Sequence, residues 1–281
     1  MSAEIGVLGA TGQQGGAVVR ALLARGARVR ALVRDDGVPA ARDLTALGAR
    51  VVRADTDVPT TLPEAFADLG ALFVMTVFAE RGPAGEVVQG RAVADAATAA
   101  GVPGVVYSSV GGAERGSGVP HFESKWAVER YFRDAGPPTT VVRPVFFMNN
   151  FLGSMAPVHD GDSLVLRAPL RPDVPLQMIA VRDVGAVAAA VLLDPDLVPS
   201  GAVEVAGDER TPEEVARALG RLAGVPGRFE PVPVDGVEDE DSRAMFEWFA
   251  TPPSYRADFA ATRRLWPEVQ DLDAFLLPRS P

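Results

Sequence analysis

The chain has 281 residues and 47% hydrophobic content, which is enough to bury the core of one α/β domain with a smaller appended lobe. It contains no cysteine and only two histidines, His121 and His159, so disulfides and thiolate metal sites are excluded and we expect no bound metal. The formal net charge of −10 argues against direct binding to nucleic acid, because phosphate neutralisation needs a basic surface.

The sequence contains neither a candidate membrane span nor a candidate signal peptide, and the expected location follows from this. Uninterrupted apolar stretches such as residues 186–193 are far shorter than the ~20 residues that a membrane span needs. No basic region followed by an apolar run precedes the first strand, so we see no signal peptide. We therefore expect a cytoplasmic protein with no membrane partner.

Strand-like and helix-like segments alternate through the first half of the chain. This order predicts right-handed crossovers and a parallel sheet with helices on both faces, which is the doubly wound α/β fold of Rossmann type. The expected strands are residues 5–8, 28–33, 50–54, 71–77, 105–108 and 140–145. The expected helices are residues 14–25, 40–47, 62–69, 86–100 and 123–135.

A glycine-rich turn over residues 9–16 joins the first expected strand to the first helix. Gly9 lets the chain leave the strand, Gly12 lets backbone N–H groups approach a phosphate, and Gly15 lets the helix pack close to the strand. The helix N-terminus adds unsatisfied N–H donors and a partial positive charge. The pattern predicts a site for a dinucleotide pyrophosphate, built from Gly9, Thr11, Gly12, Gln13, Gln14 and Gly15.

The residues at the end of the second strand indicate which dinucleotide binds. Arg34 is the first polar residue after the strand and can make paired, charge-assisted hydrogen bonds to the 2′-phosphate of NADP. The alternative is Asp35, which can accept a hydrogen bond from the ribose 2′-hydroxyl of NAD. Thr76, at the end of the fourth expected strand, is expected beside the pyrophosphate or the nicotinamide ribose, because strand carboxyl ends line the nucleotide crevice.

Several motifs resemble those of a known protein family. The G-x-x-G-x-x-G spacing is similar to that of extended short-chain dehydrogenases/reductases, and residues 9–16 resemble the NmrA-like (HSCARG-like) branch of the atypical members. Two further motifs resemble the same branch. They are the H-F-x-x-K pattern from His121 to Lys125 and the V-R-P…N pattern within residues 139–151. The resemblance extends over residues 4–210.

This resemblance implies roles for individual residues. It favours Arg34 over Asp35, and therefore NADP(H) as the preferred cofactor with NAD(H) as the alternative. Asp55 matches a family aspartate that approaches adenine. Lys125 matches the lysine that holds the nicotinamide ribose, and Asn150 matches an asparagine near the nicotinamide end.

The position of the usual catalytic tyrosine is occupied by His121. Short-chain reductases place a proton-transferring tyrosine four residues before the lysine, on the same helix face. Here His121 stands four residues before Lys125, and neither Tyr107 nor Tyr131 has the required spacing. Histidine can donate a proton near neutral pH, so His121 is expected to act as proton donor or substrate contact, or else to be a structural residue at a helix start.

The resemblance implies two functions of different kinds. The first is an NADPH-dependent oxidoreductase that reduces a small planar acceptor such as a quinone, a dye or a carbonyl compound. The second is a non-catalytic sensor of the NADPH/NADP⁺ ratio that regulates a protein partner. The departure at His121 favours the sensor. An apolar patch from Phe146 to Met148 favours the reductase, since alternation along a strand places Phe147 toward a substrate pocket and Phe146 in the core.

The second half of the chain is organised differently. After about residue 150 the alternation weakens and prolines become dense. We predict a dinucleotide-binding core over residues 1–150 and a mainly substrate-side lobe over residues 151–281. Residues 177–181 and 203–205 are expected to return to the core sheet.

Three helix starts are expected from capping signals. Thr61 with Glu64, and Thr211 with Glu214, each show a threonine followed three residues later by a glutamate, which is the pattern of a capping box. Asp183 precedes a helical pattern and is expected to be an N-cap residue rather than a catalytic acid.

Overall fold

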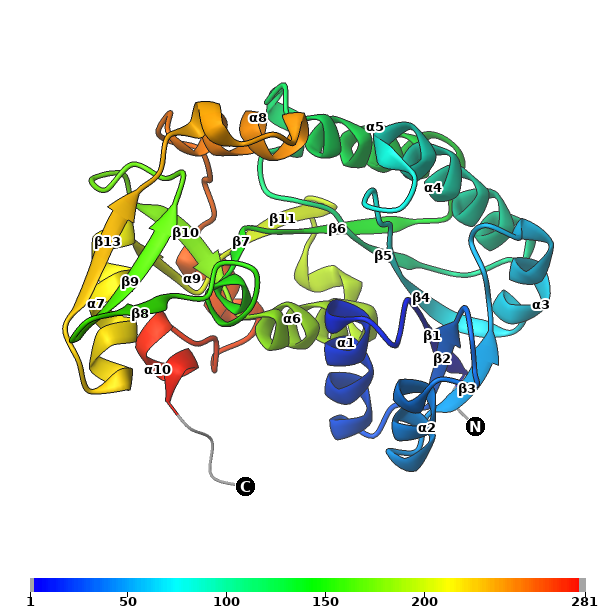
Figure 1. Ribbon diagram of the computed structural model, residues 1–281. Helices are drawn as coiled ribbons and strands as arrows, with labels where there is room; N and C mark the ends of the chain where they lie inside the picture. The colour runs from blue at the N-terminus through cyan, green and yellow to red at the C-terminus, as the bar shows by residue number, and fades with distance from the viewer. Residues whose placement is uncertain (1–2, 278–281) are drawn as a thin grey trace.

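The computed structural model describes residues 3–277, and its centre is a seven-stranded sheet in which all neighbouring strands are parallel (Figure 1). From β1 the sheet grows in one direction through β2 and β3, and in the other through β4, β5, β6 and β11. This Rossmann-like arrangement confirms the predicted doubly wound sheet. The strands are β1 (Glu4–Leu8), β2 (Val29–Val33), β3 (Arg50–Arg53), β4 (Leu69–Met75), β5 (Val105–Ser108), β6 (Thr139–Pro144) and β11 (Ala202–Val205).

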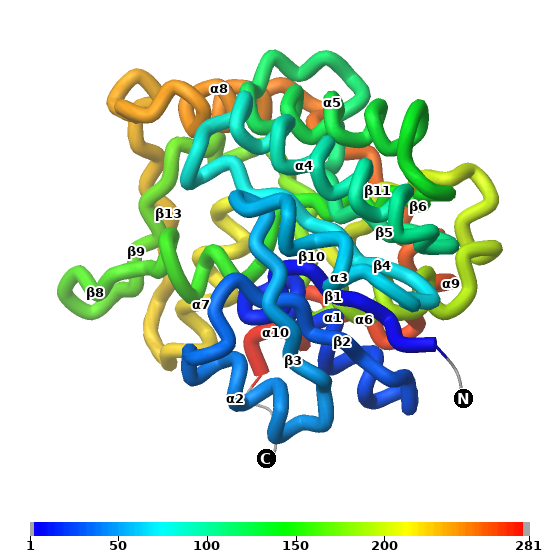
Figure 2. The backbone as a smooth tube through the Cα atoms, turned by 90° about the vertical axis from the view of Figure 1, so that its right-hand side faces the viewer, coloured from blue at the N-terminus to red at the C-terminus, as the bar shows by residue number. Residues whose placement is uncertain are grey.

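Helices cover both faces of this sheet, with α4 and α5 on one side of the central strands and α1 and α6 on the other (Figure 1 and Figure 2). Successive residues of β1 point to opposite faces, and both faces are buried. Val7 belongs to the core beneath α1, whereas Leu8 belongs to the core beneath α4. The helices are α1 (Gln13–Ala24), α2 (Pro39–Ala46), α3 (Leu62–Phe66), α4 (Gly82–Ala99), α5 (Pro120–Ala135) and α6 (Val181–Leu193).

The rest of the chain forms two small sheets and the last four helices. One sheet has the order β12-β10-β7 and the other β13-β9-β8. Helix α8 packs against α5, along the upper edge of the molecule in Figure 1. These elements are β7 (Phe146–Phe147), β8 (Val158–Asp160), β9 (Ser163–Ala168), β10 (Leu176–Ile179), β12 (Asp208–Arg210), β13 (Gly227–Pro231), α7 (Pro212–Ala223), α8 (Glu240–Phe249), α9 (Phe259–Leu265) and α10 (Leu272–Leu276). Short 3-10 turns lie at Pro59–Thr61, Ala113–Arg115, Met148–Leu152, Pro195–Leu197 and Val234–Gly236.

One of the two segments expected to return to the central sheet does not do so. Strand β11 pairs with β6, as predicted for residues 203–205. The prediction for residues 177–181 was wrong, because β10 pairs with β7 and β12 in a separate sheet. Since β11 occupies the outer edge of β6, β10 pairs instead with the two-residue strand β7 that follows β6.

The helix starts also differ from expectation. The capping box of α7 forms as predicted, with Thr211 accepting from the Glu214 N–H. Thr61 does not cap α3, because its hydroxyl accepts from the Asp55 N–H at 2.9 Å and donates to the Val58 carbonyl at 2.8 Å. Asp183 is not an N-cap either. It lies within the first turn of α6, fully buried.

Asp183 joins the C-terminal segment to the core. Its carboxylate accepts from the Trp266 indole at 3.1 Å and from the Gln270 N–H at 2.9 Å. Helix α5 begins at Pro120, three residues earlier than expected, because proline suits the first position of a helix. His121 and Lys125 therefore lie on one helix. Within residues 3–277, no helix is long and apolar enough to cross a membrane.

Candidate functional site

A cleft of about 230 Å³ lies at the carboxyl ends of four neighbouring strands. The residue after β1 (Gly9), the residue after β2 (Arg34) and the residue after β4 (Thr76) all line it, as does Asp55 two residues beyond β3. Ligands of doubly wound sheets bind at this edge. Six predicted cofactor contacts thus meet in one cleft, whose full lining is Leu8, Gly9, Thr11, Gly12, Leu32, Arg34, Ala54, Asp55, Thr56, Met75, Thr76, Val77, Glu80 and Gln89.

The glycine turn has the geometry of an anion cradle. Gly9 has φ +68°, a left-handed conformation that favours glycine. A Cβ on Gly15 would lie 2.2 Å from the Gly9 carbonyl oxygen, so α1 and the turn touch backbone to backbone. Gly12 is the N-cap of α1 and brings no side chain to cap it. The first-turn N–H groups of α1 are therefore free to meet an anion.

Gln13 and Gln14 occupy the first turn of α1 outside the residues that line the cleft. Gln14 joins the start of α1 to the end of β5, because its side-chain oxygen accepts from the Ser108 hydroxyl at 2.7 Å. Gln13 is exposed.

Arg34 is paired with an acid that the sequence pattern did not single out. Two guanidinium nitrogens donate to the Glu80 carboxylate, at 2.7 and 3.0 Å, and the side chains are 60% and 52% exposed. Asp35, the alternative ribose acid, and Asp55, the residue expected at adenine, both form local turns. Asp35 accepts from the Gly37 N–H, and Asp55 accepts from the Asp57 N–H. Of these residues, Arg34 is the cation at the cleft. Glu80 follows β4 in the sequence, and Arg34 follows β2. The two residues meet because the strand order places β4 and β2 on either side of β1.

Lys125 reaches the end of the cleft from α5. Its ammonium donates to the Thr76 carbonyl at 3.1 Å and to the Glu86 carboxylate at 2.8 Å. Glu86 is fully buried and also accepts from the Thr76 hydroxyl at 2.7 Å and from the Ser124 hydroxyl. Burial raises the pKa of Glu86, but the Lys125 charge and these hydrogen bonds outweigh it, so the pKa lies below its ordinary value. No local pattern marks Glu86, since it stands among small residues of α4.

The tyrosine nearest to this network, Tyr107, does not line the cleft. The Tyr107 hydroxyl is 2.9 Å from the Thr76 hydroxyl, and the side chain is completely buried. Burial raises the pKa of Tyr107 well above its ordinary value. Tyr107 thus supports Thr76 rather than supplying a proton to the cleft.

His121 forms a close pair with another residue that sequence reasoning missed. Its Nδ1 lies 2.6 Å from one oxygen of Asp241, and its backbone N–H donates to the other oxygen at 2.8 Å. The imidazole stacks on Phe78, with centroids 4.6 Å apart and planes 15° apart. Burial lowers the pKa of His121, and Asp241 only partly opposes this, so the pKa lies below its ordinary value.

The two remaining predicted residues lie on β7 and the turn after it. Phe146 is buried in the core beside Phe151, whereas Phe147 is half-buried. Neither Phe147 nor Asn150 lines the cleft described above. The neighbouring Asn149 is used structurally, because its side chain accepts from the Val181 N–H at the start of α6. Within the described part of the chain, no cluster of three acidic or histidine side chains could hold a metal ion.

The doubly wound parallel sheet and the glycine turn at its carboxyl edge define a Rossmann-like α/β protein. Residues 1–276 match the family model described as the NmrA-like family. The chain belongs to the NmrA-like family.

Comparison with individual proteins gives three informative matches. An NAD(P)H azoreductase from Xenophilus azovorans is 31% identical over 89% of this chain and 88% of its own length. The NADPH-dependent quinone oxidoreductase of Escherichia coli, solved with NADPH, has a TM-score of 0.82 at 24% identity, covering 97% of this chain and 98% of that one. Nmra, a negative transcriptional regulator solved with NAD, has a TM-score of 0.81 at 22% identity, covering 98% and 94%. At such identities the structural matches show a shared fold.

Proposed function

We propose that this protein is an NADPH-dependent oxidoreductase that reduces a small planar acceptor such as a quinone, an azo dye or a carbonyl compound. The observation that carries the proposal is the position of Lys125, whose ammonium reaches the Thr76 carbonyl at the end of the cleft. We infer that the nicotinamide would lie beside the face of α5 that carries His121 and Lys125. The azoreductase relative and the quinone oxidoreductase neighbour support the reaction class.

The residues present fit a dinucleotide. The space above Gly12 and the uncapped N-terminus of α1 suit the pyrophosphate, and Arg34 suits the 2′-phosphate. Thr76, Lys125 and Asn150 are assigned to the nicotinamide half. When bound, a reduced nicotinamide supplies a hydride. Three further assignments complete the proposed site: Asp55 at adenine, Phe147 at the acceptor, and the residues 9–15 of the glycine turn at the phosphates.

The preference for NADP(H) is assigned to Arg34. We expect the wild type to bind NADP(H) about 10- to 150-fold more tightly than NAD(H), and Arg34→Ala to remove most of this difference. The reason is a charge-assisted pair worth about 1.5–3 kcal/mol. Calorimetric titration with both cofactors measures it, with Arg53→Ala as a control, because Arg53 is an exposed cation beside the same strand ends. Equal affinities in the wild type would contradict the assignment.

The proton donor is assigned to His121. Because the pKa of His121 lies below its ordinary 6.5 in the unliganded protein, kcat/KM should fall as pH rises through a midpoint below about 6.5. His121→Phe should lower kcat by about 10²-fold, remove this fall and leave NADPH binding nearly unchanged. His159→Gln is the control, since it removes the other histidine, which is exposed on β8. An unchanged pH profile in His121→Phe would show that water supplies the proton.

A second function is favoured by a specific feature, the histidine at the tyrosine position. A protein that binds NADP(H) without turnover could report the NADPH/NADP⁺ ratio to a protein partner, and the regulator Nmra shares the fold. Anaerobic NADPH oxidation against quinones, azo dyes and aldehydes separates the two. Tight binding with no turnover on any acceptor would replace the reductase with the sensor.

A further inference from the structure

We propose that Asp241 is a positioning residue that fixes the tautomer and orientation of His121, so that Nε2 is the nitrogen presented to the acceptor. This inference rests on the proposed reductase function. Asp241 lies 120 residues after His121, in the first turn of α8. A residue from the C-terminal part of the chain thus takes part in the chemistry at α5.

The two oxygens of Asp241 have distinct tasks. The backbone N–H of His121 can only donate, so one oxygen is committed to it at 2.8 Å. The other oxygen then faces Nδ1 at 2.6 Å. A carboxylate accepts but does not donate, so Nδ1 must carry the proton whether the ring is neutral or charged. Nε2 is therefore the nitrogen that titrates.

The ring is also held by its aromatic neighbours. Phe78 stacks on one face, and Phe122 meets His121 edge-on with centroids 4.7 Å apart. The His121 and Asp241 side chains are only 11% and 13% exposed. Among residues 3–277, no side chain or carbonyl is hydrogen-bonded to Nε2. The geometry leaves that nitrogen for a ligand.

Helix α8 is anchored firmly enough to hold the carboxylate in place. Its N-terminus is capped by Asp239, which accepts from the Ser242 N–H at 2.8 Å. Trp248, further along α8, packs edge-on against Phe122 of α5 at 5.1 Å. Trp248 also contacts Tyr255, beyond the end of the helix, at 5.1 Å.

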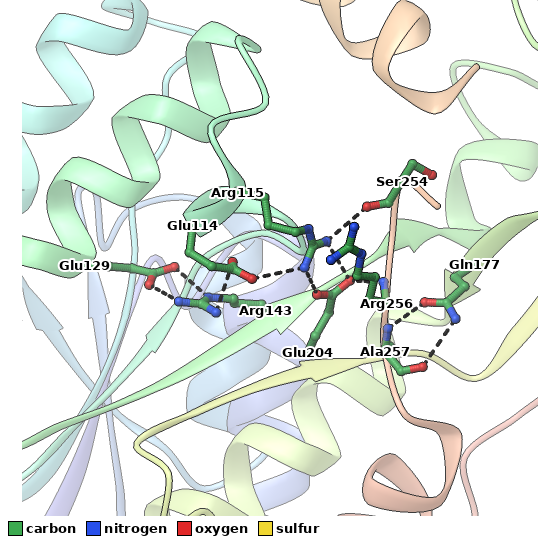
Figure 3. Close-up of polar contacts among 9 residues, drawn as sticks. All are labelled: Glu114, Arg115, Glu129, Arg143, Gln177, Glu204, Ser254, Arg256 and Ala257. Carbon is green, nitrogen blue, oxygen red and sulfur yellow. Dashed lines mark hydrogen bonds and ion pairs between the residues drawn. The ribbon is translucent and has the colours of Figure 1, made fainter. Parts of the chain in front are cut away.

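The segment after α8 is tied to β11 of the central sheet and to β10 by a network of ion pairs and hydrogen bonds (Figure 3). Arg115 pairs with Glu204 of β11 at 2.8 Å and donates to the Ser254 carbonyl at 3.0 Å. Glu204 also accepts from the Arg256 N–H at 2.7 Å. Gln177 bonds both the N–H and the carbonyl of Ala257. The segment that follows α8 is thus held in place relative to the sheets.

The charged groups that face His121 come from three helices. They are Asp241 on α8, with Asp239 at its cap, Lys125 on α5 and Glu86 on α4. Glu86 and Lys125 are paired with each other, which leaves Asp241 as the acid in direct contact with the ring. Its charge favours the imidazolium, which burial disfavours.

The proton step follows from this arrangement. A bound reduced nicotinamide, held by Thr76, Lys125 and Asn150, would supply a hydride to the acceptor, and the acceptor oxygen or nitrogen would then need a proton. The Nε2–H bond of the His121 imidazolium breaks, and an O–H or N–H bond forms on the acceptor. His121 is left neutral with its proton on Nδ1, hydrogen-bonded to Asp241.

Nitrogen NMR of protein labelled with ¹⁵N-histidine tests the tautomer without any turnover. The chain has two histidines, so His159→Gln assigns the signals. We expect neutral His121 to carry its proton on Nδ1. In Asp241→Asn the single amide oxygen stays with the His121 N–H and the NH₂ faces Nδ1, so the proton should move to Nε2 and the pKa should fall. The same tautomer and pKa in both proteins would overturn the proposal.

Kinetics test the consequence. Asp241→Asn should lower kcat by about 10²-fold, the scale of a lost general acid, and should have no further effect in a His121→Phe background. Glu240→Gln removes an exposed charge one residue away and should leave kcat unchanged. An equal loss from Asp241→Asn with and without His121 would overturn the positioning role. Failure of the reductase proposal looks different: no acceptor would be reduced, while the tautomer would still differ between wild type and Asp241→Asn.

Discussion

Gly12→Val is expected to abolish binding of the nicotinamide dinucleotide while leaving the melting temperature close to that of the wild type. Gly12 has φ −81° and ψ 172°, which any residue adopts, and an added Cβ would meet only the Gly9 carbonyl oxygen at 3.3 Å. The valine would instead fill the cleft above the N-terminus of α1, where the pyrophosphate is expected. Calorimetric titration and a circular dichroism melt on the same protein measure the two effects.

Gly15→Val is the matched comparison, because it lies in the same motif and has the opposite expected effect. Its Cβ would lie 2.2 Å from the Gly9 carbonyl oxygen and 2.7 Å from the carbonyl carbon, both backbone atoms that cannot rotate away. We expect a loss of stability of at least about 1–3 kcal/mol, the usual cost of overpacking. Retained dinucleotide binding in Gly12→Val would place the pyrophosphate elsewhere.

Glu86→Ala is expected to destabilise the fold by about 3–5 kcal/mol, because it removes one partner of a buried ion pair. Lys125 would lose its counter-charge, and the Thr76 and Ser124 hydroxyls would lose an acceptor. Thermal and urea unfolding measure the change. Glu64→Ala is the control, since Glu64 is an exposed glutamate near the start of α3, and it should change stability by less than about 0.5 kcal/mol.

The pH dependence of this difference has a definite sign. The pKa of Glu86 is below its ordinary 4.5 in the folded protein, so its stabilising contribution is fully present above about pH 4.5. It is lost as pH falls through the lowered value, because the carboxylate must then take up a proton. The stability gap between wild type and Glu86→Ala should therefore narrow in acid. A gap that stays constant to pH 3 would show that Glu86 acts through packing alone.

Local pattern was sufficient for the central part of the fold and for one end of the site. The strand–turn–helix of residues 4–24 is recognisable because its glycines are required by local geometry. Gly9 has a left-handed φ, and Gly15 packs against the backbone of its own turn. The alternation of strands and helices implies parallel pairing through the geometry of crossovers. Arg34, Asp55 and Thr76 then fall at one edge, because each follows a strand of the same sheet.

The partners of these residues were decided only by the tertiary structure. Arg34 meets Glu80 across 46 residues, Lys125 meets Glu86 across 39, and His121 meets Asp241 across 120. Hydrophobic periodicity tells which face of an element is buried, but it does not tell which other element covers that face.

The two capping errors and the misplaced strand have the same cause. Thr61 and Asp183 carry side chains suited to capping. The Thr61 hydroxyl instead accepts from the Asp55 N–H, six residues earlier, and the Asp183 carboxylate accepts from the distant Trp266 indole. Strand β10 reads as a buried strand, and only the occupied edge of β6 decides that it pairs with β7. The sequence by itself thus determined the sheet, the glycine turn and the residues at the strand ends. The packing of α4, α5 and α8 decided which acids stand beside Lys125 and His121, because those contacts join parts of the chain that no local pattern links.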